Sequence, residues 1–239
     1  MNWQLAFSLF LMALPGSIVT ATLALPVLLD GRSLPLSLTS LQIITLAQSA
    51  FLTATAAVVG TRLADDVGLR CPLLFALLKD QDILMPLHSQ VLPVFVGGVM
   101  GGVIIWGFSQ LLPASRSLPL IVGLLYGGIT EEVLMRWGVM TFLAWLGWRM
   151  GQGGVGQISV VWMGTAIFLS AVIFGLSHLP VFDSSGSHPS LTSVSLMLSG
   201  NTLFGLLAGY LFWQYGLEAA MLTHALAHVL AVALPMTKQ

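Results

Sequence analysis

Long apolar stretches, separated by short polar ones, run along almost the whole chain. A helix needs about 20 apolar residues to cross the roughly 30 Å hydrocarbon layer of a bilayer, and it satisfies its backbone hydrogen bonds without water. The pattern therefore predicts an all-α fold, a polytopic membrane helix bundle with about seven transmembrane helices. We expect these helices at residues 3–29, 37–60, 91–112, 117–147, 157–179, 191–214 and 217–235.

Two polar segments interrupt this pattern. Residues 61–90 hold three of the eight basic and four of the nine acidic residues, and they predict a long loop with an amphipathic interfacial helix near 72–79. Residues 183–190, DSSGSHPS, predict a turn-rich loop. We expect one membrane domain, in which residues 1–116 supply N-terminal transmembrane helices and the polar loop. Residues 117–235 then supply a helical core that carries the candidate chemistry.

The N-terminal segment predicts a retained membrane helix and not a cleaved signal peptide. It lacks a basic start, and its apolar character continues past Pro15 to Leu29. The lysines and arginines of the expected loops divide four against three between the two sides of the membrane, which favours a cytoplasmic N-terminus. The two groups are Arg62, Arg70, Lys79 and Arg149 against Arg32, Arg116 and Lys238. The expected location is the plasma (cytoplasmic) membrane.

Composition agrees with a membrane protein and excludes other classes. Hydrophobic residues make up 56% and charged residues 7% of the 239 residues, and the mean hydropathy is +0.94. A soluble domain carries about 25% charged residues. A net charge of −1 without a basic block argues against a nucleic-acid partner. The single cysteine, Cys71, excludes an internal disulfide, and we expect it to be a packed bystander.

One apolar stretch carries a cluster of charge, GGITEEVLMRWGVM at residues 127–140. Thr130 could cap a helix that starts at the membrane surface, where acidic residues in the first turn are ordinary. However, residues 117–129 and 133–147 would each rise only about 20 Å as separate helices, too little to span. One long helix, distorted at its Gly-Gly pair, is the simpler prediction, and it places the carboxylates inside the membrane.

Charges at that depth need partners, because each costs about 2.5–3.5 kcal/mol at the bilayer centre. Glu132 and Arg136 stand four apart on one helix face, in the order that favours an ion pair. Glu131 is rotated about 100° from Glu132 and has no local cation. We therefore expect Glu132 and Arg136 to support a site in which Glu131 is available for chemistry.

Three histidines also lie in apolar helices. FGLSH places Phe174 one turn before His178, and HALAH places His224 and His228 four apart on one face. In one chemistry, Zn²⁺ and a bound water are held by ligands drawn from Glu131, His178, His224 and His228, although HALAH lacks the glutamate of the zincin helix. In the other, Glu131 and His178 polarise a water, while His224 and His228 donate hydrogen bonds to the oxyanion.

Three short motifs on successive late helices resemble those of the CPBP family, the type II CAAX prenyl endopeptidases and related bacteriocin-processing or immunity proteins. The motifs are Glu131-Glu132-x3-Arg136, Phe174-x3-His178 and His224-x3-His228. The resemblance covers about 117–235 and implies an all-helical intramembrane endopeptidase. It implies that Glu131 activates the water beside His178, that Glu132 and Arg136 support it, and that His224 completes the site. This chain has His228 where the family commonly has asparagine, and a histidine can donate to an oxyanion or bind a metal.

These observations predict a CPBP-type endopeptidase that acts on a membrane-associated peptide or protein substrate in the lipid bilayer. No nucleic-acid partner is expected, the only cofactor expected is Zn²⁺ under the first chemistry, and the oligomeric state stays open. Two other functions also stay open. Intramembrane acids and histidines mark proton or metal pathways in transporters, and a non-catalytic immunity or scaffold protein could retain the same residues.

Overall fold

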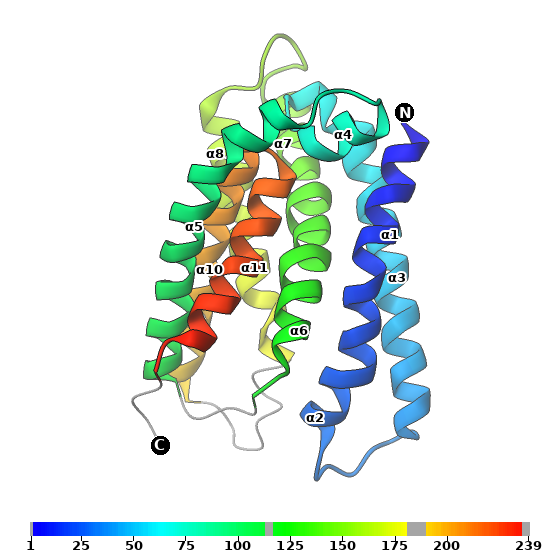
Figure 1. Ribbon diagram of the computed structural model, residues 1–239, viewed down its shortest axis with the longest axis vertical. Helices are drawn as coiled ribbons and strands as arrows, with labels where there is room; N and C mark the ends of the chain where they lie inside the picture. The colour runs from blue at the N-terminus through cyan, green and yellow to red at the C-terminus, as the bar shows by residue number, and fades with distance from the viewer. Residues whose placement is uncertain (1, 113–116, 181–189, 236–239) are drawn as a thin grey trace.

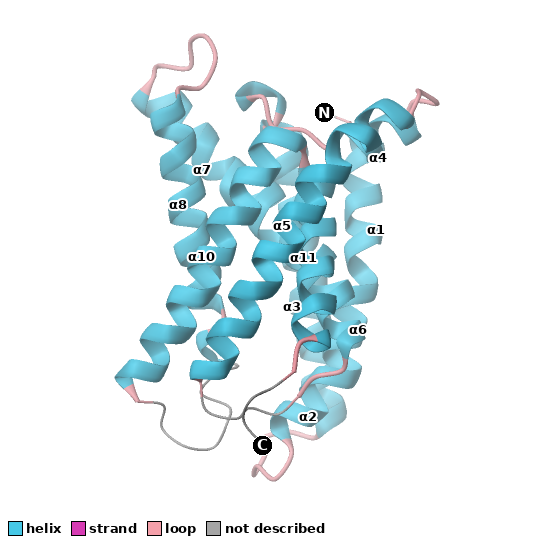
Figure 2. Ribbon diagram, turned by 60° about the vertical axis from the view of Figure 1, so that its left-hand side comes forward, coloured by secondary structure: helices cyan, strands magenta, loops and turns pink. Residues whose placement is uncertain are grey.

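The computed structural model describes residues 2–112, 117–180 and 190–235. Every regular element within these ranges is helical, and the long helices pack side by side as an upright bundle (Figures 1 and 2). The elements are α1 (Trp3–Val19), η1 (Thr20–Ala24), α2 (Leu25–Leu29), α3 (Leu38–Leu63), η2 (Asp65–Val67), α4 (Pro72–Leu78), α5 (Leu84–Leu111), α6 (Leu120–Val122), η3 (Gly123–Glu131), η4 (Val133–Met140), α7 (Thr141–Leu146), η5 (Gly147–Gly151), α8 (Val160–Ser177), α10 (Leu191–Tyr215) and α11 (Leu217–Ala233).

The predicted membrane bundle is confirmed. Five helical segments of the described chain are long and apolar enough to cross a membrane, and they are Trp3–Leu29, Leu38–Leu63, Leu84–Leu111, Val160–Ser177 and Leu191–Tyr215. The other two expected spans are also helical. One is the run from α6 to η5, which carries the charged cluster, and the other is α11, a shorter apolar helix of 17 residues. The chain is an integral membrane protein.

The polar segment 61–90 is only partly a loop. The expected interfacial helix is present as α4, which lies across the upper end of the bundle (Figure 1). The next span begins at Leu84 and not near residue 91. Pro86 does not prevent this earlier start, because a proline in the first helical turn has no intrahelical hydrogen bond to lose. The expected loop at 183–190 lies outside the described residues, apart from Ser190.

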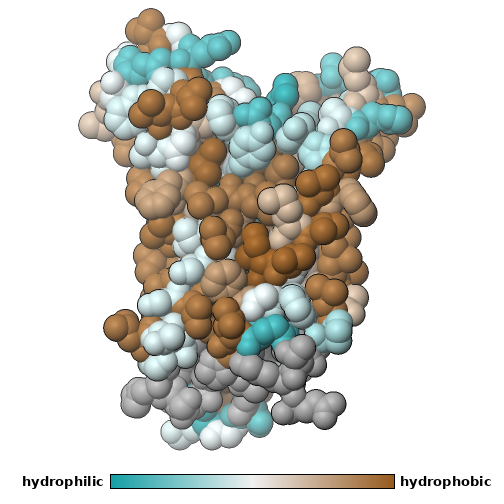
Figure 3. Space-filling model, turned by 90° about the vertical axis from the view of Figure 1, so that its left-hand side faces the viewer, coloured by the Kyte–Doolittle hydropathy of each residue, from teal (hydrophilic) through white to brown (hydrophobic). Residues whose placement is uncertain are grey.

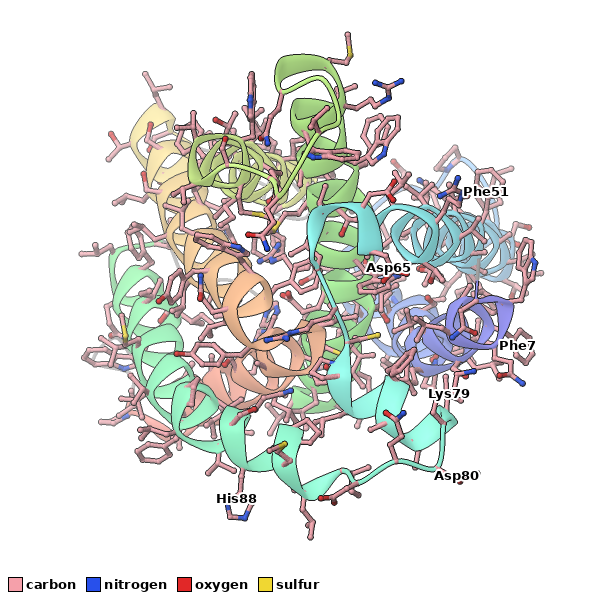
Figure 4. The ribbon with its side chains drawn as sticks, turned by 90° about the horizontal axis from the view of Figure 1, so that it is seen from above. Phe7, Phe51, Asp65, Lys79, Asp80 and His88 are labelled. Atoms are coloured by element: carbon pink, nitrogen blue, oxygen red, sulfur yellow. The ribbon has the colours of Figure 1, made fainter. Side chains whose placement is uncertain are left out.

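The surface has the polarity of a membrane protein. A brown apolar belt covers the middle of the molecule, and hydrophilic residues gather at the ends (Figure 3). Seen from above, Phe7 and Phe51 point outward from α1 and α3, where they are 61% and 71% exposed (Figure 4). Such side chains are stable in lipid, because hydrocarbon tails replace water around them.

The charged stretch lies inside one continuous helical run, as the lengths predict. On both sides of Glu132 the backbone winds as a π-helix, in η3 and η4, so the distortion expected at Gly127 and Gly128 is present. Such windings are rare and occur frequently at functional sites. No helix begins at Thr130, so the capping interpretation is wrong. The Thr130 hydroxyl instead donates to the Ala13 carbonyl of α1 at 2.7 Å, which ties the two helices together.

Small residues bring the helices of the core into close contact. Glycines on α5 face α11, and a Cβ atom added at Gly98 would lie 2.4 Å from the Leu226 side chain. Without a hydrophobic driving force in lipid, such close backbone approach lets dispersion hold helices together. This packing supports α11, the helix that carries His224 and His228.

Candidate active site

Three helical segments bring the candidate residues to one cavity of about 540 Å³. Glu131 ends η3, His178 directly follows α8, and His224 and His228 lie on α11. All four side chains line the cavity, together with Phe174 of α8. The other two histidines lie elsewhere, since His88 is exposed on α5 at the upper end (Figure 4) and His188 is outside the described residues.

Glu131 and His178 face each other across a gap of 3.8 Å between Oε1 and Nε2. The His178 Nδ1 lies 2.8 Å from the Phe174 carbonyl oxygen. A carbonyl only accepts, so Nδ1 donates its hydrogen there, and the Nε2 of the neutral ring carries a lone pair. Two acceptors at this separation can each accept one hydrogen of a single water molecule. The side chains are 16% and 28% exposed, so water reaches them from the cavity.

Glu132, unlike Glu131, is fully buried and lies between Arg136 and His224. Its Oε2 lies 3.2 Å from Arg136 Nε, and its Oε1 accepts from His224 Nδ1 at 2.8 Å. The Arg136 guanidinium is also buried and lies over the Phe174 ring, 4.9 Å from its centroid. The predicted Glu132–Arg136 pair is therefore present. The bond to His224 was not predicted, and it orients that imidazole.

The two imidazoles of α11 lie side by side against η3. Their rings stack with centroids 5.0 Å apart and planes 14° from parallel. A Cβ atom added at Gly127 would lie 2.8 Å from His228 Nε2 and 3.3 Å from His224 Nε2. Because residue 127 is glycine, no side chain of η3 presses on these two nitrogens, and both imidazoles line the cavity.

The fit of these residues to a metal ion is poor. Among the described residues, no three histidine, cysteine or acidic side chains gather closely enough to hold one. His224 does have a carboxylate on its Nδ1, as zinc-bound histidines usually do. Zinc therefore stays an untested prediction, and no step below is routed through a metal.

Sequence patterns missed part of the cavity wall. Tyr126, Asn201 and Phe204 line it, and the Phe204 ring lies 4.4 Å from His224, centroid to centroid. Asn201 and Phe204 stand in an ordinary apolar helix with no motif to mark them. Tyr126 does have a signal, because it precedes Glu131 by five residues in the same distorted stretch.

Comparison with known proteins gives one finding. A family model described as type II CAAX prenyl endopeptidase Rce1-like matches residues 113–230. This range contains all three motifs and every candidate site residue. No match to the chain is found among curated proteins or among solved structures.

Proposed function

The chain belongs, through residues 113–230, to the Rce1-like family of type II CAAX prenyl endopeptidases, and we propose from this that it hydrolyses peptide bonds of membrane-associated substrates. The family and the five apolar helices support a protease of the membrane. We place it in the plasma (cytoplasmic) membrane. The observation that carries the mechanism is the pair of Glu131 and His178, two acceptors that face each other over a cavity.

The first step is the activation of water. A water molecule bound between Glu131 and His178 donates one hydrogen to each, and Glu131 accepts the proton as the oxygen attacks the substrate carbonyl carbon. A carbon–oxygen bond forms, and the carbonyl oxygen becomes an oxyanion. Protonated Glu131 then gives its proton to the leaving nitrogen, the carbon–nitrogen bond breaks, and a carboxylic acid and an amine result.

The oxyanion is held on the side of the cavity that His224 and His228 line. His224 and His228 donate to it through Nε2–H, which stabilises charge that exists only in the transition state. In this step His224 is an imidazolium, which donates Nδ1–H to the Glu132 carboxylate and Nε2–H to the oxyanion. Arg136 in turn neutralises and holds Glu132. In this mechanism Glu132, Arg136 and Phe174 position other groups and do not touch the substrate.

The test uses Glu131→Gln, which keeps the size of the side chain and removes the base. We expect kcat to fall by about 10²–10⁴, the usual contribution of a general base, on quenched fluorescent peptides with apolar or lipidated tails in detergent or proteoliposomes. Glu218→Gln is the matched control, because Glu218 is a buried carboxylate that does not line the cavity. Undiminished cleavage by Glu131→Gln would overturn the mechanism.

The same purified protein tests whether a bound metal ion is needed for cleavage. We expect elemental analysis to find no stoichiometric zinc in purified protein, and we expect chelators to leave cleavage unchanged. Stoichiometric zinc, with activity lost on chelation and restored by Zn²⁺, would replace this mechanism by the metal chemistry. Metal flux into proteoliposomes that is lost in His224→Ala would favour the transporter. Full biological function with both Glu131 and His178 replaced would favour the non-catalytic protein.

A further inference from the structure

The cavity continues beyond the candidate catalytic residues toward the lower end of the bundle in Figure 1. Its wall there comes from α2, α6 and the last turns of α5 and α11, with Leu28, Leu112, Leu120 and Val232 among its residues. Ser117 also lines the cavity and is exposed. The mouth is therefore at this end, and a substrate that enters through it passes along η3 before it reaches Glu131.

Tyr126 stands on that route. It lies on η3 five residues before Glu131, and in a π-helix residues five apart are joined by a backbone hydrogen bond and are neighbours on the surface. Both side chains line the cavity. The Tyr126 hydroxyl has no hydrogen bond to another described residue, and it is not one of the fully buried atoms that lack a partner. The hydroxyl is therefore open to the cavity, where a substrate group can replace water as its hydrogen-bond partner.

Helix geometry says which part of the substrate lies there. Five residues of an α-helix rise by about 7.5 Å at about 1.5 Å per residue, and the wider π-helix of η3 rises somewhat less. An extended peptide rises by about 3.3 Å per residue. Tyr126 thus lies about two substrate residues from Glu131, on the side of the mouth. We propose that the Tyr126 hydroxyl hydrogen-bonds a main-chain amide of the substrate about two residues from the scissile bond. The proposal rests on the proposed function, because it assumes a peptide substrate.

Binding is measured without cleavage, so that the proposal is separate from the mechanism. The protein is Glu131→Gln, the probe is a fluorescent form of a peptide that the wild type cleaves, and the readout is Kd. We expect Tyr126→Phe in this background to weaken binding about 2- to 10-fold, the range for one neutral hydrogen bond. Tyr210→Phe is the matched control, because Tyr210 is half exposed on α10, packs on Trp213 and does not line the cavity.

A substrate variant identifies the bond itself. Replacing the amide about two residues from the scissile bond by an ester removes its N–H and weakens its carbonyl as an acceptor. We expect the ester to weaken binding to the protein with Tyr126 and to have little further effect on Tyr126→Phe. Equal losses with both proteins, or an unchanged Kd in Tyr126→Phe, would overturn the proposal. A Glu131→Gln protein that still cleaves the peptide would overturn the mechanism. The Kd values would then be measured by stopped flow before turnover, and the comparison of Tyr126→Phe with Tyr210→Phe would still test the proposal.

Discussion

Adjacent residues of one helix have different roles here because each helical step turns the side chain by about 100°. Glu132 is fully buried between Arg136 and His224, whereas Glu131 is 16% exposed and faces the cavity. A buried carboxylate that contacts an arginine and accepts from a histidine N–H is held in one position. Its neighbour Glu131 faces the cavity and is the one that water can reach.

The close contact of Gly127 with the two imidazoles of α11 gives a prediction at the scale of a single methyl group. Gly127→Ala places a carbon 2.8 Å from His228 Nε2, at the end of a side chain that can move aside. We expect thermal stability close to that of the wild type and a kcat lower by about 10²-fold, the effect of losing one oxyanion donor. Gly164→Ala is the control, because its added methyl group meets nothing within 4 Å. Normal turnover by Gly127→Ala would contradict the proposed oxyanion position.

Cys71 gives a second prediction at this scale, and it lies outside the membrane-spanning helices. Burial raises the pKa of the Cys71 thiol well above its usual value, and the nearby Glu218 and Asp65 carboxylates raise it further. Since the thiolate is the reactive form, we expect little maleimide labelling of the folded protein between pH 7 and 9. Labelling should become rapid after denaturation. Fast labelling of the native protein would show that the thiol is accessible.

At the scale of elements, two hydrogen bonds connect the segment around the interfacial helix α4 to α11, the helix that carries two candidate catalytic histidines. The Leu74 amide of α4 donates to Glu218 Oε1 of α11 at 2.8 Å, and the Leu217 amide donates to the Arg70 carbonyl at 3.0 Å. Between α10 and α11, Gly216 has φ of +110°, a conformation that favours glycine, and it lies against Pro72. The start of α11 is therefore set by its contacts with the 70–74 segment.

The Glu218 contact can be tested by comparing two substitutions. Glu218→Ala leaves the Leu74 amide buried without an acceptor, and we expect it to reduce the free energy of unfolding by about 1–3 kcal/mol. Glu218→Gln keeps an acceptor oxygen and should lose much less. Thermal melts in detergent, followed by circular dichroism, measure the difference. Equal stability of the two variants would mean that the contact contributes little.

At the scale of the whole molecule, the two ends of the bundle carry different structural features. The upper end in Figure 1 carries α4, and the lower end carries the mouth of the cavity, with α5 crossing from one to the other. We expect a substrate that enters through this mouth to reach the candidate site from that side of the membrane. With the N-terminus on the cytoplasmic side, as the charges of the loops favour, that side is the outer one.

Cysteine labelling tests this arrangement. In a Cys71→Ser background, Lys79→Cys reports on the upper end and Ser117→Cys on the lower end, since both residues are exposed. We expect a membrane-impermeant maleimide added to intact cells to label Ser117→Cys and not Lys79→Cys. The reverse pattern would invert the orientation and keep the fold. Labelling of both positions from one side would contradict the bundle itself.

Local patterns in the sequence predicted most of the fold and the members of the site. The spans follow from the length of apolar runs, and the Glu132–Arg136 pair follows from a spacing of four. The start of α5 at Leu84 was missed because its first turns are polar enough to resemble a loop. The alternative in which Thr130 caps a helix, already disfavoured by the span lengths, is wrong because the helical run continues through this residue. The Thr130 hydroxyl bonds to a carbonyl of α1, 117 residues away.

The sequence by itself determined that the chain crosses a membrane as helices and which polar residues lie at depth, because both depend on short-range composition. Only the tertiary structure decided which side chains meet: His224 with Glu132, His178 with Glu131, and the two imidazoles of α11 with the backbone of η3 at Gly127. In lipid, outward and inward helix faces are both apolar, so no periodicity reveals how each helix is rotated. That rotation is set by close packing at small residues, which is a property of the assembled bundle.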